Sequence, residues 1–94
     1  MRIEFDSQVA GSWNADTETM RFIVHRDNKP ILCGVSREAL EDRSRKTGLH
    51  ASALRNLFEQ YRDEIERKAA AKIRSREFEP NGTVLIRTTD LNGE

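Results

Sequence analysis

The chain has 94 residues, of which sixteen are Lys or Arg and sixteen are Asp or Glu, so its formal net charge is zero. Balanced charge excludes a strong overall field that would draw the protein onto DNA or an anionic membrane. Hydrophobic residues make up 36% of the chain, which is too large a share for a disordered tail. A chain of this length is expected to form a single domain, residues 1–94, with a modest core.

The single cysteine, Cys33, has no partner for an internal disulfide, which is typical of a reducing compartment. The first six residues carry two acidic side chains and no apolar run, so we do not expect a secretion signal. No apolar stretch approaches the roughly 20 residues that a membrane span requires. We therefore expect a cytoplasmic protein with no membrane contact.

The first third of the chain predicts strands. Residues 2–5 alternate polar and apolar side chains, as in a short strand, and residues 6–18 are polar and loop-like, with Trp13 as the one large anchor. Residues 19–26 and 31–35 are rich in β-branched and aromatic side chains and predict a hairpin.

The turn of this hairpin is predicted within the cluster Asp27-Asn28-Lys29-Pro30. A two-residue turn there is expected to place Phe22 opposite Val35 and Val24 opposite Cys33. These four side chains then share one face of the sheet, because side chains alternate between the two faces along a strand.

Two helices are predicted next. Ser36 has the character of an N-cap and Gly48 of a stop signal for the first helix. The second is expected to run unbroken from about Ala51 to about Arg76, because seven apolar residues follow a 3.6-residue period. These are Leu54, Leu57, Phe58, Tyr61, Ile65, Ala69 and Ile73.

The chain ends with a predicted strand over residues 83–88 and a frayed tail over residues 90–94. Strands on both sides of two helices indicate an α+β fold. We expect two layers: a small antiparallel sheet, made of the hairpin and the C-terminal strand, and two helices packed on one of its faces.

A set of mostly structural residues follows a recognisable pattern: Trp13, Arg21, Phe22, Cys33, Val35, Ser36, Glu38, Ala39, Leu40, Phe58, Arg62, Ile65 and Ala69. This pattern resembles a bacterial family of domains of unknown function, DUF1488, over roughly Phe5 to Asp90. The chain departs from it at the hairpin turn, where an Asp-Gly type of turn is expected. The resemblance implies a two-layer β-β-α-α-β domain in a bacterial cytoplasm and supplies no reaction, ligand or partner.

Catalytic and metal-binding patterns are missing from the sequence. Cys33 and His25 are predicted on opposite faces of the hairpin, so they do not form a nucleophile and base pair. His25 and His50 lie in different elements, and no Cys-x-x-Cys or His-Glu-x-x-His spacing occurs. We therefore expect a non-enzymatic protein without a metal or other cofactor.

The same alternation turns three large aliphatic residues, Ile23, Leu32 and Leu85, away from the helices. We predict that they are covered either by the N-terminal segment, with Phe5, Val9 and Trp13 folding across them, or by another protein surface, with Trp13 at the rim of that interface. Trp13, Ile23, Leu32 and Leu85 are thus the candidate interaction surface. The preferred hypothesis is a small protein-interaction or regulatory module that binds a protein partner or a second copy of itself.

The alternative hypothesis is an accessory nucleic-acid-binding protein that uses the basic end of the second helix. Lys68, Lys72, Arg74 and Arg76 concentrate there, but they are also placed to interact with the helix dipole. Interleaved acidic residues and the neutral total make strong nucleic-acid binding an unfavoured prediction. Arg62, beside the apolar stripe, is a candidate anion contact, with pairing to Glu59 or Glu66 as the structural alternative.

Overall fold

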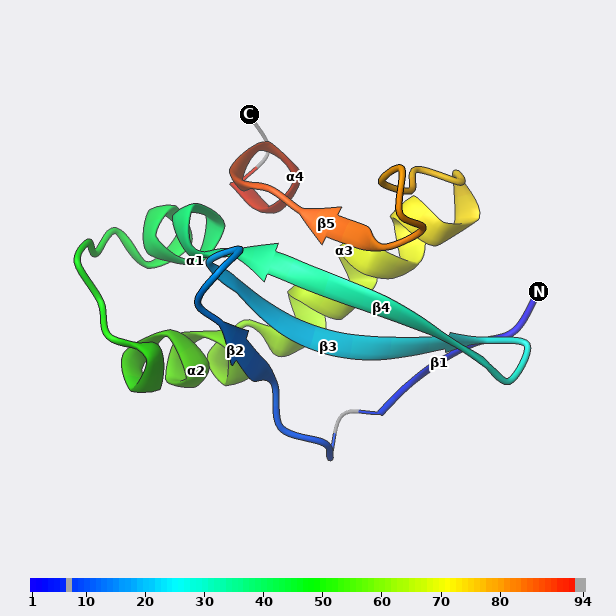
Figure 1. Cartoon of the computed structure of the whole chain (residues 1–94), viewed down its shortest axis with the longest axis horizontal. Coiled ribbons are helices and arrows are strands. Elements are labelled where there is room, and N and C mark those ends of the chain that lie inside the picture. The colour runs from blue at the N-terminus through cyan, green and yellow to red at the C-terminus, as the bar shows by residue number, and fades with distance from the viewer. Residues whose placement is uncertain (7, 93–94) are drawn as a thin grey trace.

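The computed structural model describes residues 1–6 and 8–92, which form strands and four helices in one α+β domain. In chain order the elements are β1 (Ile3–Phe5), β2 (Ser12–Asn14), β3 (Thr19–Arg26), β4 (Lys29–Ser36), α1 (Arg37–Ser44), α2 (Ala51–Gln60), α3 (Arg62–Arg74), β5 (Val84–Ile86) and α4 (Thr88–Asn92). The predicted α+β class and the two-layer arrangement are confirmed (Figure 1).

The sheet is mixed rather than antiparallel. Its strands follow the order β1-β3-β4-β5, and β2 pairs with the same edge of β3 that β1 uses further along. The C-terminal strand β5 runs parallel to β4, so the prediction of an antiparallel C-terminal strand is wrong. Three helices separate these two strands in the chain, and a crossover of this length allows the chain to return in the same direction, as a parallel pair requires.

The hairpin turn consists of Asp27 and Asn28, whose φ angles of 51° and 67° both lie in the left-handed region. Such a turn matches the right-handed twist of a two-residue hairpin. It pairs Arg26 with Lys29 and Phe22 with Cys33, two residues away from the predicted register. A shift of two residues leaves every side chain on its predicted face, because alternation has a period of two.

Strand β2 lies inside the segment predicted to be a loop. The sequence did not predict it, because three residues are too few to show the alternation of a strand. It is preceded by Gly11, and a Cβ atom at that position would lie 2.9 Å from the Phe58 ring. Gly11 therefore lets the backbone pass close to the helix layer, which brings β2 to the edge of β3.

The long predicted helix is interrupted at Tyr61, whose φ of −105° and ψ of 14° separate α2 from α3. The prediction of one unbroken helix is therefore wrong, although its apolar stripe is still buried. The first helix ends at Ser44 with Arg45 in the left-handed conformation, before the predicted stop at Gly48. The predicted N-cap is confirmed, because the Ser36 hydroxyl accepts a hydrogen bond from the Ala39 N–H.

The end of the chain is also more ordered than predicted. Residues 88–92 form α4, and Leu91 is buried in the core, so the prediction of a frayed tail is wrong for these residues. Residues 93–94 of the predicted tail lie outside the described residues. Helix α4 packs against α1, so the C-terminal helix is part of the helix layer (Figure 1).

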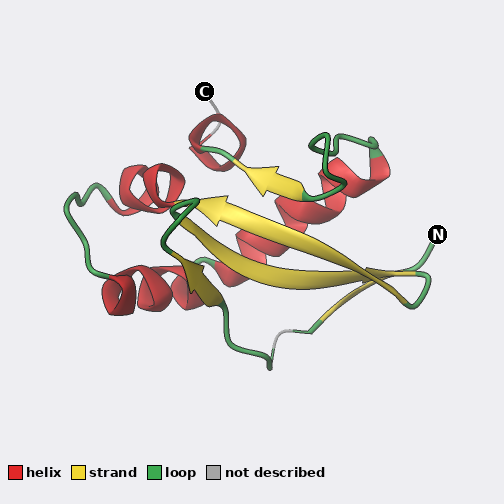
Figure 2. Ribbon diagram, in the orientation of Figure 1, coloured by secondary structure: helices red, strands yellow, loops and turns green. Residues whose placement is uncertain are grey.

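The core lies between the sheet and the helices. Helices α2 and α3 pass behind the β3–β4 ribbon, and Figure 2 looks onto the opposite face of that ribbon, which no described helix crosses. We call the two sides the helix face and the outer face. On the helix face the sheet contributes buried side chains from three strands: Met20, Phe22, Val24, Cys33, Val35, Val84 and Ile86.

Candidate interaction surface

The outer face places the three predicted aliphatic residues on adjacent strands. Ile23 pairs directly with Leu32 across β3 and β4, and Leu85 lies beside Gly34 on β5. Leu32 is 36% exposed, and Ile23 and Leu85 are half-buried. The structure therefore brings together three of the four residues predicted to form the surface.

Two depressions hollow the outer face. One, of about 420 Å³, is bounded by Leu85 and by the loop over residues 79–83. The other, of about 490 Å³, is bounded by Asp6, Val9 and Ile23. Arg21 and Leu32 line both and therefore form a ridge between them.

Trp13 is not part of this face. It pairs with Met20, so its side chain points to the helix side, where it packs against the core. The Arg37 guanidinium lies 5.1 Å from the centre of its ring. The predicted cover by Phe5 and Trp13 is wrong for the same reason, because Phe5 pairs with the helix-face residue Val24. Of that segment, Val9 borders a depression and is itself 55% exposed.

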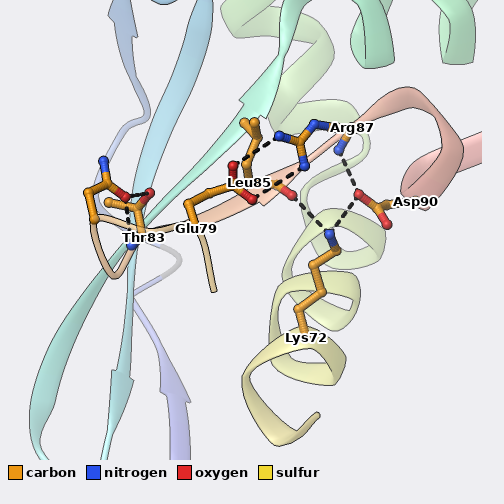
Figure 3. Close-up of polar contacts among 7 residues, drawn as sticks. Lys72, Glu79, Thr83, Leu85, Arg87 and Asp90 are labelled. Atoms are coloured by element: carbon orange, nitrogen blue, oxygen red, sulfur yellow. Dashed lines mark hydrogen bonds and ion pairs between the residues drawn. The ribbon is translucent and has the colours of Figure 1, made fainter. Parts of the chain in front are cut away.

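Polar contacts join residues beside the first depression, and Figure 3 shows these contacts. Arg87 donates two hydrogen bonds to the Glu79 carboxylate, at 2.9 and 3.3 Å, and these bonds with the negative charge raise the pKa of Arg87. Asn81 accepts hydrogen bonds from both the N–H and the hydroxyl of Thr83. These contacts hold the loop over residues 79–83 in place next to β5.

The outer edge of β5 is blocked by a side chain. Lys72, from α3, donates to the Leu85 carbonyl at 3.1 Å and pairs with Asp90 at 2.9 Å (Figure 3). Burial alone would raise the pKa of Asp90, but the Arg87 N–H and the Lys72 ammonium outweigh it and lower that pKa. Because the Lys72 ammonium occupies a carbonyl of this edge strand, it opposes addition of a further strand, so another protein is more readily accommodated on the outer face than on this edge.

Arg62 is engaged within the protein. Its guanidinium is bonded to Glu59 at 2.8 Å, to Glu66 at 3.2 Å and to the Asp6 carbonyl at 2.9 Å. It also lies 5.0 Å from the centre of the Phe58 ring, and the residue is only 6% exposed. This geometry favours the structural alternative, because an external anion would have to displace a carboxylate.

The Cys33 thiol is buried between the sheet and the helices at 1% exposure. Burial, partly opposed by a backbone hydrogen bond from Val24, raises its pKa to about 12, so the reactive thiolate is scarce at neutral pH. His25 lies on the outer face, since its position in β3 alternates with that of Phe22. Within residues 1–6 and 8–92, no group of three or more His, Cys, Asp or Glu side chains is placed to hold a metal ion.

Sequence reasoning missed Arg21 as a member of the outer face. The alternation that predicts an outward Ile23 predicts an outward Arg21 as well. The sequence could not show that Arg21 lies between two depressions, which is what makes it part of the candidate surface. None of the helices in the described part of the chain is long and apolar enough to cross a bilayer.

These features define a small two-layer α+β domain with one closed and one open sheet face. The family model for proteins of unknown function, DUF1488, matches residues 3–86, and the chain belongs to this family. A solved structure of a DUF1488 protein of unknown function from Shewanella loihica PV-4 has the same fold, with a TM-score of 0.83. It is 24% identical, and the match covers 92% of this chain and 94% of that chain. No curated protein matches the chain.

Proposed function

We propose that the domain is a non-enzymatic protein-interaction module that pairs with a second copy of itself through the outer face. The observation that carries the proposal is the Ile23–Leu32 pair, which lies with Leu85 on a sheet face that no described helix covers. Clustered apolar side chains on an otherwise charged surface mark interaction sites.

The shape of the outer face supports a second copy as the partner. A ridge between two depressions is self-complementary, since a two-fold axis brings the ridge of each copy into a depression of the other. Charge supports the same arrangement. Within the described residues, the side chains of Arg21, on the ridge, and Asp6, at the rim of the second depression, have no ion-pair partner of their own. Each is thus available to the other copy.

Sedimentation of the protein at tens of micromolar tests the proposal. We expect a dimer for the parent and a shift toward monomer for Leu85→Lys, because a buried unpaired ammonium opposes association. The matched control is Gln60→Lys, which adds the same charge on an exposed helix position. Circular dichroism should be the same for all three proteins.

A parent that stays monomeric at 1 mM contradicts self-association. Equal weakening by Leu85→Lys and Gln60→Lys also contradicts it, because the effect would then come from net charge rather than from the outer face. The setting that we propose is a bacterial cytoplasm, which is supported by the lone thiol of Cys33 and by the Shewanella relative.

The nucleic-acid alternative needs a different site from the predicted one. Lys72 is held by Asp90 and by the Leu85 carbonyl, so it is not available to a phosphate. Arg74 and Arg76, at the end of α3, instead line a hollow together with Arg26 and Lys29, which flank the hairpin turn.

A further inference from the structure

A further hollow lies between the hairpin turn and the end of α3. It measures about 650 Å³, and four basic side chains line it: Arg26, Lys29, Arg74 and Arg76. One acidic residue, Asp27, borders it as well, and the apolar residues Met1, Ile73 and Phe78 complete the lining. We call this hollow the basic groove. Its two walls come from segments about fifty residues apart in the sequence.

Three of the four cations of the basic groove form no polar contact within the described part of the chain. In the described part of the chain, the side chains of Lys29, Arg74 and Arg76 form no ion pair or hydrogen bond, and Arg26 contacts only the Phe78 ring, 5.9 Å from its centre. The acidic Asp27 is partly engaged, because its carboxylate accepts a hydrogen bond from the Arg2 N–H at 2.8 Å. The local charge is therefore strongly positive although the whole chain is neutral.

The end of α3 does not need these arginines as caps. The Ile73 carbonyl accepts from the Arg76 N–H at 3.1 Å, and the Lys72 carbonyl accepts from the Glu77 N–H at 2.9 Å. This is the closed C-terminal turn in which a left-handed residue, usually glycine, follows the helix. Arg76 occupies that position with a φ of 57°, so a strained arginine stands where glycine would be more stable.

We propose that the basic groove binds the phosphates of a single-stranded nucleic acid. Basic residues on both walls suit a flexible phosphate backbone that runs along the groove, and the Phe78 ring, together with the Arg26 guanidinium that lies over it, adds an aromatic and cationic contact for a base. Neutral total charge leaves the binding without long-range attraction, so it is weak at physiological salt, as the sequence predicts. The site is independent of the outer face and of self-association.

A fluorescein-labelled 12-nucleotide oligouridylate tests the proposal by fluorescence anisotropy between 50 and 200 mM NaCl. We expect a Kd of about 1 to 100 µM at the lowest salt. Four phosphate contacts predict a slope of log K against log salt of about −2.8, since each contact on a single strand contributes about −0.7.

The decisive variant combines Arg74→Gln with Arg76→Gly. It removes two contacts and should reduce the slope to about −1.4. Glycine also relieves the left-handed backbone, so the urea midpoint of unfolding should stay or rise, which separates loss of binding from loss of folding. The matched control, Lys46→Gln with Arg55→Gln, removes the same charge from exposed positions outside the groove and should leave the slope unchanged.

Three results would overturn the proposal. One is an anisotropy that does not change up to 1 mM protein at 50 mM NaCl. The second is an equal loss of binding in the groove variant and in the control, which would assign the effect to net charge. The third is displacement of the oligouridylate by polyglutamate at equal charge concentration, which would assign the groove to acidic peptides.

Discussion

The two faces of the β3–β4 ribbon are built from neighbouring residues of similar character, yet they meet opposite environments. Phe22 and Cys33 on the helix face are almost fully buried, whereas their neighbours Ile23 and Leu32 form a pair on the outer face. Residue type therefore does not decide which face of this sheet is closed. The helices decide it, because the described helices of this chain all lie away from the outer face (Figure 2).

The difference is chemical as well as steric. Arg62, beneath the sheet, is held by two carboxylates and a carbonyl, whereas within the described residues the side chain of Arg21, on the outer face, forms no ion pair or hydrogen bond. A buried cation needs such partners to offset the loss of water, and an exposed one does not. The outer face thus keeps charge and apolar area available for a partner.

The largest expected effect concerns thiol reactivity on the two faces. Cys33 should react slowly with a thiol reagent at pH 7, because a pKa of about 12 in place of 9.0 lowers its thiolate fraction about a thousandfold. A cysteine moved to the outer face, Leu32→Cys in a Cys33→Ala background, should react much faster than Cys33 at protein concentrations too low for self-association, because Leu32 is 36% exposed. Labelling followed by mass spectrometry measures both rates, and equal rates would refute the assigned faces.

The next effect compares the two arginines. Arg62→Ala should lower the free energy of unfolding by about 3 kcal/mol, because it removes a guanidinium partner from the buried Glu66. Arg21→Ala should change it by less than about 0.5 kcal/mol, as exposed substitutions usually do. Urea unfolding monitored by Trp13 fluorescence measures both variants. Similar losses would mean that the outer face is closed in solution.

Two glycines give a smaller contrast. Gly11→Ala should destabilise the fold by about 1–3 kcal/mol, because the added Cβ would lie 2.9 Å from the buried Phe58 ring. Gly34→Ala, on the outer face, should be neutral or stabilising by up to about 1 kcal/mol, since its Cβ would meet only an ordinary 3.4 Å contact with Thr19. Thermal unfolding of both variants checks the order, and a more stable Gly11→Ala protein would contradict the packing.

The smallest expected effect depends on pH at the β5 edge. The folded-state pKa of Asp90 is lowered, so its ionised form stabilises the fold above the unfolded-state pKa of about 4, and this contribution is lost as pH falls through the folded pKa. Asp90→Asn should cost about 0.5–1 kcal/mol at pH 7 and progressively less below pH 4. Paired urea titrations at pH 7 and pH 3 measure the difference. A cost that is constant with pH would exclude the Lys72 pair as its source.

Local signals in the sequence predicted much of the fold. The β-branched run over residues 19–26 and the N-cap Ser36 correspond to β3 and to the start of α1, because each depends on a few neighbouring residues. The outward placement of Ile23, Leu32 and Leu85 was predicted correctly even though the hairpin register was wrong by two residues. Alternation survives such a shift, since its period is two.

Contacts between distant segments were beyond those local signals. The parallel pairing of β5 depends on where the chain returns to the sheet after three helices. The orientation of Trp13 toward the helix side depends on its pairing in the three-residue strand β2. No proline or glycine marks the break at Tyr61, so the apolar stripe alone predicted one unbroken helix.

The sequence by itself determined which residues share a face, because alternation along a strand and the 3.6-residue helical period follow from backbone geometry alone. Only the tertiary structure decided which shared faces are open and which charges stand together. It joined Arg26 and Lys29 to Arg74 and Arg76, and it removed Lys72 from that cluster by pairing it with Asp90. Burial and electrostatics depend on distances in space, and these are set by how the layers pack rather than by the order of residues.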